Sequence, residues 1–292
     1  MLFRPHLSGE GEIGNITYPK LVSPKINGVR GINQDGTLYA RSLKQIPNKH
    51  TSTKFRGLDY DGFDGELYVG NISDKNVFTN TTSAVMSIAG EPDTFWGVFD
   101  AYHPTLPFYR RIEELAKRHD ASMHSVLLLP HVQVNNDTEL QGLAAICTAE
   151  GYEGLVLRDP EARYKQGRSS DAEGSFLRFV PWHSGEVEIL EIAEGQRNNN
   201  ESVENELGYL KKSSAKSNVV GSGQAGSFKV RDIQTDAIFS MSVPTFELQR
   251  HVWANPKLYI GKIAKYSYKD GVKGNIPRFP QYQGLRSPLD MS

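Results

Sequence analysis

The sequence predicts an α+β protein in two parts: a mixed domain over residues 1–184 and a small β-barrel of the OB type over residues 185–292. In the first part, short apolar runs bounded by Gly, Asn or Asp alternate with stretches of helical periodicity. After residue 184 the pattern changes to short strands separated by Gly-rich turns, with one helical stretch among them. A length of 292 residues suits one large domain or two smaller ones.

Hydrophobic periodicity separates the strands of the first part from its helices. Short apolar runs predict strands over residues 38–40, 63–69, 94–100, 125–129 and 154–157. Apolar residues spaced by three and four predict helices over 108–118 and 138–149. Thr138, with Gln141 three residues later, predicts a capping box at the start of the second helix.

The second part has the pattern of a small barrel. The weak alternation of residues 186–192 predicts a half-exposed strand, and the stretch from Asn198 to about Lys216 predicts a long polar loop. Further strands are predicted over 226–231, 237–243 and 264–268, with one helix over 245–253. Several short strands with a single helix are typical of an OB-type barrel.

Composition indicates a folded protein of a reducing compartment. Hydrophobic residues make up 38% of the chain, which is enough for packed cores. Cys147, the single cysteine, excludes an internal disulfide, and its apolar helical surroundings predict a core thiol rather than a nucleophile. No run of about 18 apolar residues and no signal-peptide pattern is present. We therefore expect a cytoplasmic protein without a membrane partner.

Charge is distributed unevenly along the chain. The net charge is −1, yet residues 208–231 and residues 256–292 each carry +5, so the remainder carries −11. Such asymmetry favours a polyanionic partner for the C-terminal third, although a solvated basic face would give the same pattern.

Lys25 is the first candidate for chemistry. Residues 23–30 read Ser-Pro-Lys-Ile-Asn-Gly-Val-Arg. A lysine becomes a nucleophile when desolvation or nearby cations lower its pKa, and Arg30 is near in sequence while Gly28 allows a tight turn. These residues alone fit an exposed lysine in a glycine turn equally well.

Two carboxylates and an aromatic ring follow in similar contexts. Glu66 lies in the run Phe-Asp-Gly-Glu-Leu of residues 63–67, and Glu153 begins the run Glu-Gly-Leu-Val-Leu-Arg. Two carboxylates that converged on a phosphate site would suit Mg²⁺ with its waters. Either glutamate could instead lie at the surface end of a strand, and Phe99, in the run of residues 95–100, could belong to the core.

In this order and spacing, the four runs resemble the motifs of covalent nucleotidyltransferases: ATP-dependent DNA ligases, RNA ligases and mRNA capping enzymes. The resemblance implies an adenylation domain over residues 1–184, in which Lys25 attacks the α-phosphate of ATP. It implies that Glu153 and Glu66 bind the metal. It also assigns nucleotide contacts to Ser23, Arg30, Glu66, Phe99, Arg178 and Arg286.

Basic residues outside these runs also resemble ligase positions. Arg41 precedes Ser42 as in the family's Arg-Ser step, and residues 164–170 resemble a Tyr-Lys-x-Gly-Arg-Ser run of DNA ligases. The sequence Pro-Arg-Phe-Pro at 277–280 resembles the last ligase motif. The resemblance therefore implies DNA phosphate contacts from Arg41, Lys165, Arg168 and Arg278. Without it, these residues would be basic loops and a basic tail.

The chain departs from the family pattern at three places. Asn27 replaces an aspartate two residues after the lysine, and Val180 stands where a second lysine is usual after the position of Arg178. After Arg286 the sequence Ser-Pro-Leu-Asp replaces the usual ending. A charge-assisted phosphate contact is worth about 1.5–3 kcal/mol, so we expect another cation to compensate for the lysine missing at Val180.

The resemblance is greatest to small ATP-dependent DNA ligases of the phage and virus type. It implies a monomer, in the host cytoplasm if a phage encodes it, that uses ATP and Mg²⁺ to seal nicks in duplex DNA through a lysyl-AMP intermediate. An RNA ligase, a capping-type nucleotidyltransferase and an inactive nucleic-acid-binding relative are the alternatives.

Overall fold

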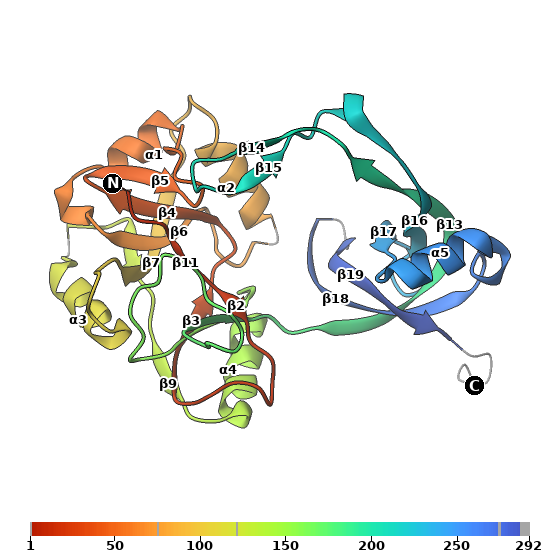
Figure 1. Ribbon diagram of the computed structural model, residues 1–292. Coiled ribbons are helices and arrows are strands. Elements are labelled where there is room, and N and C mark those ends of the chain that lie inside the picture. Colours follow the sequence, from red (N-terminus) through yellow and green to blue (C-terminus); the bar gives the residue numbers. More distant parts are fainter. Residues whose placement is uncertain (1, 75, 121, 274–275, 287–292) are drawn as a thin grey trace. The chain divides into compact units, whose positions relative to one another are not determined.

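The computed structural model describes residues 2–74, 76–120, 122–273 and 276–286. The chain divides into two compact units, Met1–Val180 and Pro181–Ser292 (Figure 1). The expected boundary at residue 184 lies four residues further on, within strand β13 (His183–Asn198). In the described part of the chain, no helix has the length and apolar character needed to cross a membrane.

The first unit contains two five-stranded sheets. One has the order β5-β4-β6-β7-β8, and its strands are Thr37–Ala40, Val29–Gln34, Phe63–Val69, Thr94–Ala101 and Val126–Leu128. Its buried face carries Phe63, Leu67, Trp96 and Val98. The helices of this half are α1 (Lys49–Lys54), α2 (Val77–Val85), α3 (Phe108–Arg118) and the short η1 (Leu58–Tyr60).

The other sheet has the order β2-β12-β10-β3-β9. Its strands are Gly9–Glu10, Phe176–Phe179, Gly154–Arg158, Lys20–Lys25 and Val132–Val134. Helix α4 (Asp137–Ala149) covers one face, where Cys147 is buried as predicted. Two short strands, β1 (His6–Leu7) and β11 (Gly167–Arg168), pair separately.

Alternation along the strands puts the candidate residues on the faces opposite these two cores. Val22 of β3 is in the core, so Ser23 and Lys25 alternate with it, and Lys25 is on the other face. Leu67 of β6 is in the other core, so Glu66 faces away from that core. Each sheet thus has one apolar face and one polar face.

The second unit is a closed five-stranded barrel of order β13-β16-β17-β19-β18, which confirms the predicted OB-type ring. Besides β13, its strands are Val219–Asp232, Ile238–Ser242, Ile276–Leu285 and Ile263–Lys273. Helix α5 (Phe246–Ala254) joins β17 to the last two strands, and η2 (Lys216–Asn218) and η3 (Pro256–Leu258) are short turns. Val187, Phe228 and Met241 lie in the barrel core.

Two local expectations were wrong. The stretch expected to be a polar loop contains a hairpin of β14 (Ser202–Glu204) and β15 (Leu210–Lys212), whose residues are all exposed and so lack the alternation that marks a strand. The cap of helix α4 is Asn136, two residues before the expected cap at Thr138. Asn136, in extended backbone, accepts a hydrogen bond from the main-chain N–H of Glu139 at 2.9 Å, so the capping box at Thr138 and Gln141 does not form.

The cap of α4 makes a testable prediction. Asn136→Ala should lower the free energy of unfolding by about 1 kcal/mol, because the N–H of Glu139 loses its acceptor. Thr138→Ala, the matched control inside the first turn, should change it by less than about 0.5 kcal/mol. Urea denaturation measures both, and a larger loss in the Thr138 variant would restore the capping box read from the sequence.

Candidate active site

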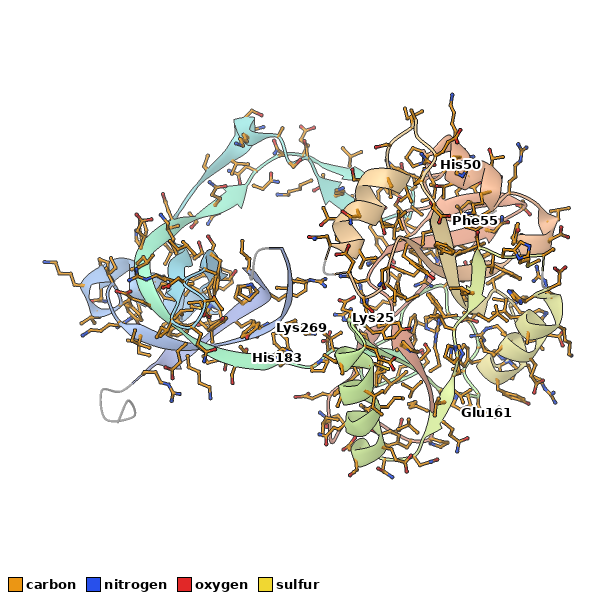
Figure 2. All side chains as sticks on the ribbon, turned by 180° about the vertical axis from the view of Figure 1, so that it is seen from behind. Lys25, His50, Phe55, Glu161, His183 and Lys269 are labelled. Carbon is orange, nitrogen blue, oxygen red and sulfur yellow. The ribbon has the colours of Figure 1, made fainter. Side chains whose placement is uncertain are left out.

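Lys25 is the last residue of β3 (Figure 2). In the ladder with β10 it lies opposite Gly154. Its Nζ atom is 2.5 Å from Oε2 of Glu153, and the two side chains are 24% and 15% exposed. The main-chain N–H of Glu153 also donates to the carbonyl of Lys25 at 3.0 Å. Strand pairing therefore brings together the predicted nucleophile and the predicted metal ligand.

The turn after β3 brings Lys25 close to the other sheet. A Cβ atom on Gly28 would lie 2.1 Å from the carbonyl oxygen of Leu67 and 3.0 Å from Cγ of Glu66. Only glycine lets the main chain pass β6 at this distance. The close approach leaves Lys25 near enough to Glu66 for their charges to interact.

Glu66 is half-buried and lies beside Glu153. Burial raises the pKa of Glu66 to about 7, against the attraction of Lys25 and Arg30 and with a further contribution from Glu153. The two candidate metal ligands therefore share one electrostatic environment. The negative charge of Glu66 is incompletely compensated there, which is what a site for a cation requires.

Arg30 is fixed between the carboxylate of Asp64 and the ring of Phe99. Its Nε and Nη2 atoms each donate to Asp64 at 2.5 Å, and Tyr164 donates its hydroxyl to the same carboxylate at 2.7 Å. Burial alone would lower the pKa of Arg30, but Asp64 outweighs it and holds that pKa above its ordinary value. The guanidinium carbon lies 4.7 Å from the ring centre of Phe99, which is 8% exposed.

A second buried carboxylate, Asp100, lies next to Phe99 in the chain. Arg111 donates to it through two nitrogens at 2.8 and 3.0 Å, and Arg158 lies 3.1 Å away. Burial opposes ionisation of Asp100, but the two arginines outweigh it and lower its pKa. Sequence reasoning missed Asp64, Asp100 and both of these arginines as supporting groups. The available signal was an acid inside each of the runs 63–67 and 95–100.

Four arginines, Arg30, Arg41, Arg168 and Arg178, lie near enough to one another for their charges to interact. Arg41 is exposed at the surface, yet partial desolvation lowers its pKa, and the charges of Arg168, Arg30 and Arg178 lower it further against the attraction of Glu66. Among the described residues, the guanidinium of Arg41 has no hydrogen-bond or ion-pair partner. Glu66 offsets this repulsion only in part, and the remaining positive charge favours binding of an anion such as phosphate. Arg178 forms an ion pair with Glu10 at 2.5 Å.

The remaining predicted DNA contacts have mixed surroundings. Lys165 is exposed and paired with Glu173. In the barrel, Arg278 lies on β19, with its guanidinium 5.5 Å from the ring of Phe279.

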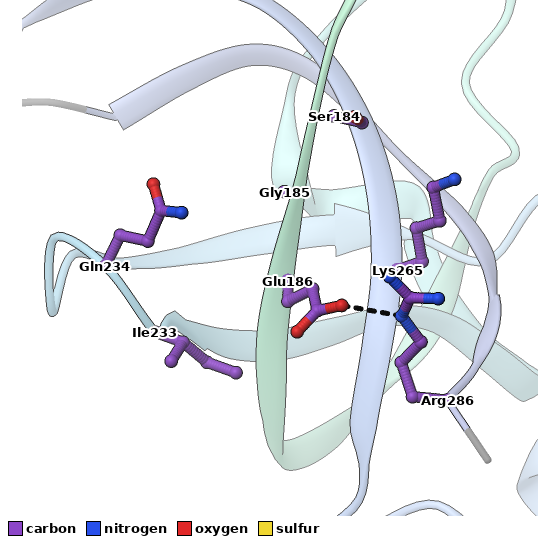
Figure 3. Close-up of a pocket in the computed structure, with 7 residues that line it drawn as sticks. All are labelled: Ser184, Gly185, Glu186, Ile233, Gln234, Lys265 and Arg286. Atoms are coloured by element: carbon purple, nitrogen blue, oxygen red, sulfur yellow. Dashed lines mark hydrogen bonds and ion pairs between the residues drawn. The ribbon is translucent and has the colours of Figure 1, made fainter. Parts of the chain in front are cut away.

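Arg286 borders a pocket of about 300 Å³ on the barrel and forms an ion pair with Glu186 at 2.6 Å (Figure 3). The figure shows these two side chains pointing toward one another. The pocket is lined by Ser184, Gly185, Glu186, Ile233, Gln234, Lys265 and Arg286.

Ser23 and Val180 complete the surroundings of Lys25. Ser23 is fully buried, and its hydroxyl has no hydrogen-bond partner among the described residues. Val180 is the first residue after β12 and is buried. Because Phe179 pairs with Leu155, Val180 lies level with Gly154, which pairs with Lys25 on the other side. A Cβ atom on Gly154 would lie 3.2 Å from Cγ2 of Val180, so a methyl group of Val180 packs against Gly154.

No family model matches the chain, and no curated protein matches it. Among solved structures, the Chlorella virus DNA ligase-adenylate is 26% identical; the match covers 98% of this chain and 100% of that one with a TM-score of 0.57. A second crystal structure of the Chlorella virus ligase-adenylate is also 26% identical, with coverage of 98% and 99% and a TM-score of 0.56. A structure from a study of Lig E DNA ligases is 19% identical, with coverage of 98% and 100% and a TM-score of 0.73.

The chain matches small ATP-dependent DNA ligases over nearly its full length. The Lig E likeness supports the fold alone, while the Chlorella virus structures also carry the sequence similarity. The two units correspond to the adenylation domain and OB-like ring of minimal ligases. Lys25, Glu66 and Glu153 meet within the adenylation domain.

The pKa of Glu66 predicts how stability depends on pH. The pKa of Glu66 is about 7 in the folded protein, against an ordinary value of 4.5 that applies to the unfolded chain. Between these two pH values the folded state therefore holds an extra proton. The contribution of Glu66 to stability therefore falls as the pH rises through this window. Glu66→Gln should be about 2 kcal/mol more stable than the unmodified protein at pH 8, with a much smaller difference at pH 4.5.

Urea denaturation at the two pH values measures this difference. The exposed Glu12 offers a matched control, because Glu12→Gln makes the same chemical change and should give no pH-dependent gain. A difference for the Glu66 variant that is the same at both pH values would contradict the raised pKa.

Proposed function

We propose that this protein is an ATP-dependent DNA ligase that seals nicks between a 5′-phosphate and a 3′-hydroxyl in duplex DNA. The observation that supports this most strongly is the contact of Lys25 with Glu153, beside Glu66, in a chain that matches ligases over nearly its full length. The proposal includes a monomer that acts in the cytoplasm, that of the host if a phage encodes it.

The first step makes the lysyl-AMP. The Nζ atom of Lys25 loses a proton and attacks the α-phosphate of ATP; the new bond is N–P, and the P–O bond to pyrophosphate breaks. In this scheme Phe99 stacks on the adenine, while Arg30 and the buried Ser23 line the nucleotide site. Arg286 would orient the pyrophosphate as it leaves.

Two transfers follow at the same place. An oxygen of the 5′-phosphate attacks the lysine-bound phosphorus, the N–P bond breaks, and the nitrogen of Lys25 takes up a proton and leaves as the amine. The 3′-hydroxyl then attacks the 5′-phosphate, and AMP leaves with the bonding electrons. Both transfers require positioning and charge neutralisation, and Arg41, Arg168, Lys165 and Arg278 are the cations assigned to the DNA.

The carboxylates fit a magnesium ion. Mg²⁺ is usually held by one or two carboxylates, substrate phosphates and waters, and Glu66 and Glu153 supply such a pair. Among the described residues no group of three or more His, Cys, Asp or Glu side chains could hold a metal, which excludes a cage built from this part of the protein alone. When bound, Mg²⁺ would offset charge on the phosphates.

Arg178 is proposed to compensate for the lysine missing at Val180. A guanidinium has five N–H donors, so it can contact a phosphate and Glu10 together. The sequence predicted a compensating cation but did not identify it, and Arg178 itself stands at the position of the first lysine of the motif.

Lys25 gives the first functional prediction. Lys25→Ala should form no covalent AMP with labelled ATP, because the nucleophilic amine is gone, yet it should still seal a pre-adenylated nick. Lys117→Ala, which removes an exposed helix lysine, is the matched control and should retain both steps. Labelled AMP on the Lys25 variant would place the nucleophile elsewhere.

A nick-sealing assay separates the alternatives. The unmodified protein is supplied with nicked DNA, ATP and Mg²⁺, and the products are read on a denaturing gel. A sealed strand supports the proposal. Sealing of nicked RNA alone would favour an RNA ligase, and AMP or GMP attachment without any sealing would favour another nucleotidyltransferase. The absence of both covalent AMP and a sealed strand would favour an inactive nucleic-acid-binding protein.

Arg286 gives the second functional prediction. Arg286→Ala should slow lysyl-AMP formation about 10-fold or more, because a charge-assisted contact to the leaving pyrophosphate is lost. Sealing of a pre-adenylated nick should change by less than about 3-fold. Lys229→Ala, which removes another exposed cation of the barrel, should change neither rate. Equal losses in both steps would contradict a role in orienting pyrophosphate.

A further inference from the structure

Residues 3–10, here called the N-terminal strap, lie beside the arginines of the site and have no role in the scheme above. The strap runs parallel to two strands that carry cations. In the ladder of β1 with β11, Leu7 lies opposite Arg168. In the ladder of β2 with β12, Glu10 lies opposite Arg178.

Acceptors on the strap hold three guanidinium groups. Nη2 of Arg30 donates to the carbonyl of His6 at 3.1 Å, and Nη1 of Arg168 donates to the carbonyl of Ser8 at 2.5 Å. Nη2 of Arg178 is 2.5 Å from the carboxylate of Glu10. The acceptors therefore come from residues 6, 8 and 10, the two-residue period of an extended chain.

The strap is itself held firmly at its start. The ring of Phe3 stacks on that of Tyr102 with centres 3.8 Å apart. The main chain of Phe3 exchanges two hydrogen bonds with the side chain of Gln34, at 2.8 and 3.1 Å. These contacts fix the strap independently of the three arginines that it holds.

The middle of the strap is equally constrained. His6 is 1% exposed and accepts a hydrogen bond from Arg158 at 3.1 Å. Burial and the neighbouring arginines lower the pKa of His6 to about 2, so the ring stays neutral and can accept this bond. A Cβ atom on Gly9 would lie 3.0 Å from the carbonyl of Ser169, so the chain passes that loop closely.

We propose that the strap is a positioning element that sets the spacing of Arg30, Arg168 and Arg178. Long like-charged side chains repel one another and would otherwise spread apart, and Arg30, Arg168 and Arg178 all lie near enough to Arg41 for their charges to act on it. Leu7 and Glu10 are three residues apart, so the two points at which the strap pairs with Arg168 and Arg178 lie within about 10 Å of each other. This inference rests on the proposed function, in which Arg178 serves the nucleotide phosphate and Arg168 a phosphate of the DNA.

Glu10 provides the test, because positioning and charge masking predict opposite results. If Glu10 positions Arg178, Glu10→Ala should weaken ATP binding about 10-fold, whereas Glu10→Gln, which keeps an acceptor, should stay within about 3-fold. If Glu10 only masks the charge of Arg178, both variants should bind ATP more tightly. Glu12→Gln is the matched control for loss of one negative charge next to the strap.

ATP affinity is best measured by calorimetry in a Lys25→Ala background, where no covalent product is expected, with thermal unfolding as the check on folding. Tighter or unchanged binding in the Glu10→Ala variant overturns the proposal. A second arm adds Glu10→Ala to Arg178→Ala; if Glu10 acts through Arg178, affinity should then change by less than about 2-fold. If Glu10→Ala still weakens ATP binding about 10-fold in the Arg178→Ala background, the proposal is also overturned.

Failure of the ligase proposal would look different. A protein that binds ATP but forms no lysyl-AMP and seals no nick would refute the ligase function, while the order of affinities among the Glu10 variants would still decide the role of the strap. A protein that binds no ATP would overturn both.

Discussion

Two buried carboxylates, Asp64 and Asp100, are the constraint on which the site depends. Both are fully buried, and each is compensated by arginine: Asp64 by Arg30, and Asp100 by Arg111 and Arg158. Removing one partner of such a pair typically costs about 3–5 kcal/mol, because the other charge stays buried and unpaired. The arginines are therefore confined to one arrangement, and the ring of Phe99 and the charge of Arg30 are fixed with them.

This constraint explains why polar groups can occupy the inner faces of both sheets. The outer face of each sheet is covered by helices and supplies the apolar burial, so the opposite faces can carry Arg30, Glu66 and Lys25. The close passage of Gly28 over β6 then brings the faces together. The result is a partly buried region, where Glu66 ionises reluctantly and a cation has a stabilising role.

The sequence predicted the elements whose stabilisation is local and repetitive. The strand Phe63–Val69 and the helix Phe108–Arg118 have clear periods and were predicted at their observed bounds. The strand Lys20–Lys25 was not predicted, because it contains Pro24 and two lysines. The ammonium of Lys20 donates to the carbonyl of Gly174 at 2.9 Å, 154 residues away, and lies 3.8 Å from the carboxylate of Asp159. The motifs named Lys25, Glu66 and Glu153, but the arginine partners and the strap depend on pairings between distant segments, which no local pattern encodes.

The free protein holds several of its candidate cations in ion pairs that phosphate can replace. Lys25 contacts Glu153, Arg286 contacts Glu186, and Lys165 contacts Glu173. Partly exposed pairs of this kind contribute at most about 1 kcal/mol, so exchanging a carboxylate for a phosphate oxygen costs little. The deeply buried pairs of Asp64 and Asp100 are too costly to exchange. Burial thus divides the charges into a fixed framework and a replaceable set, and the residues that the motif resemblance assigns to substrates lie mainly in the replaceable set. Arg30 is the exception, since it belongs to the framework and can meet a nucleotide only in the position that Asp64 and the carbonyl of His6 give it.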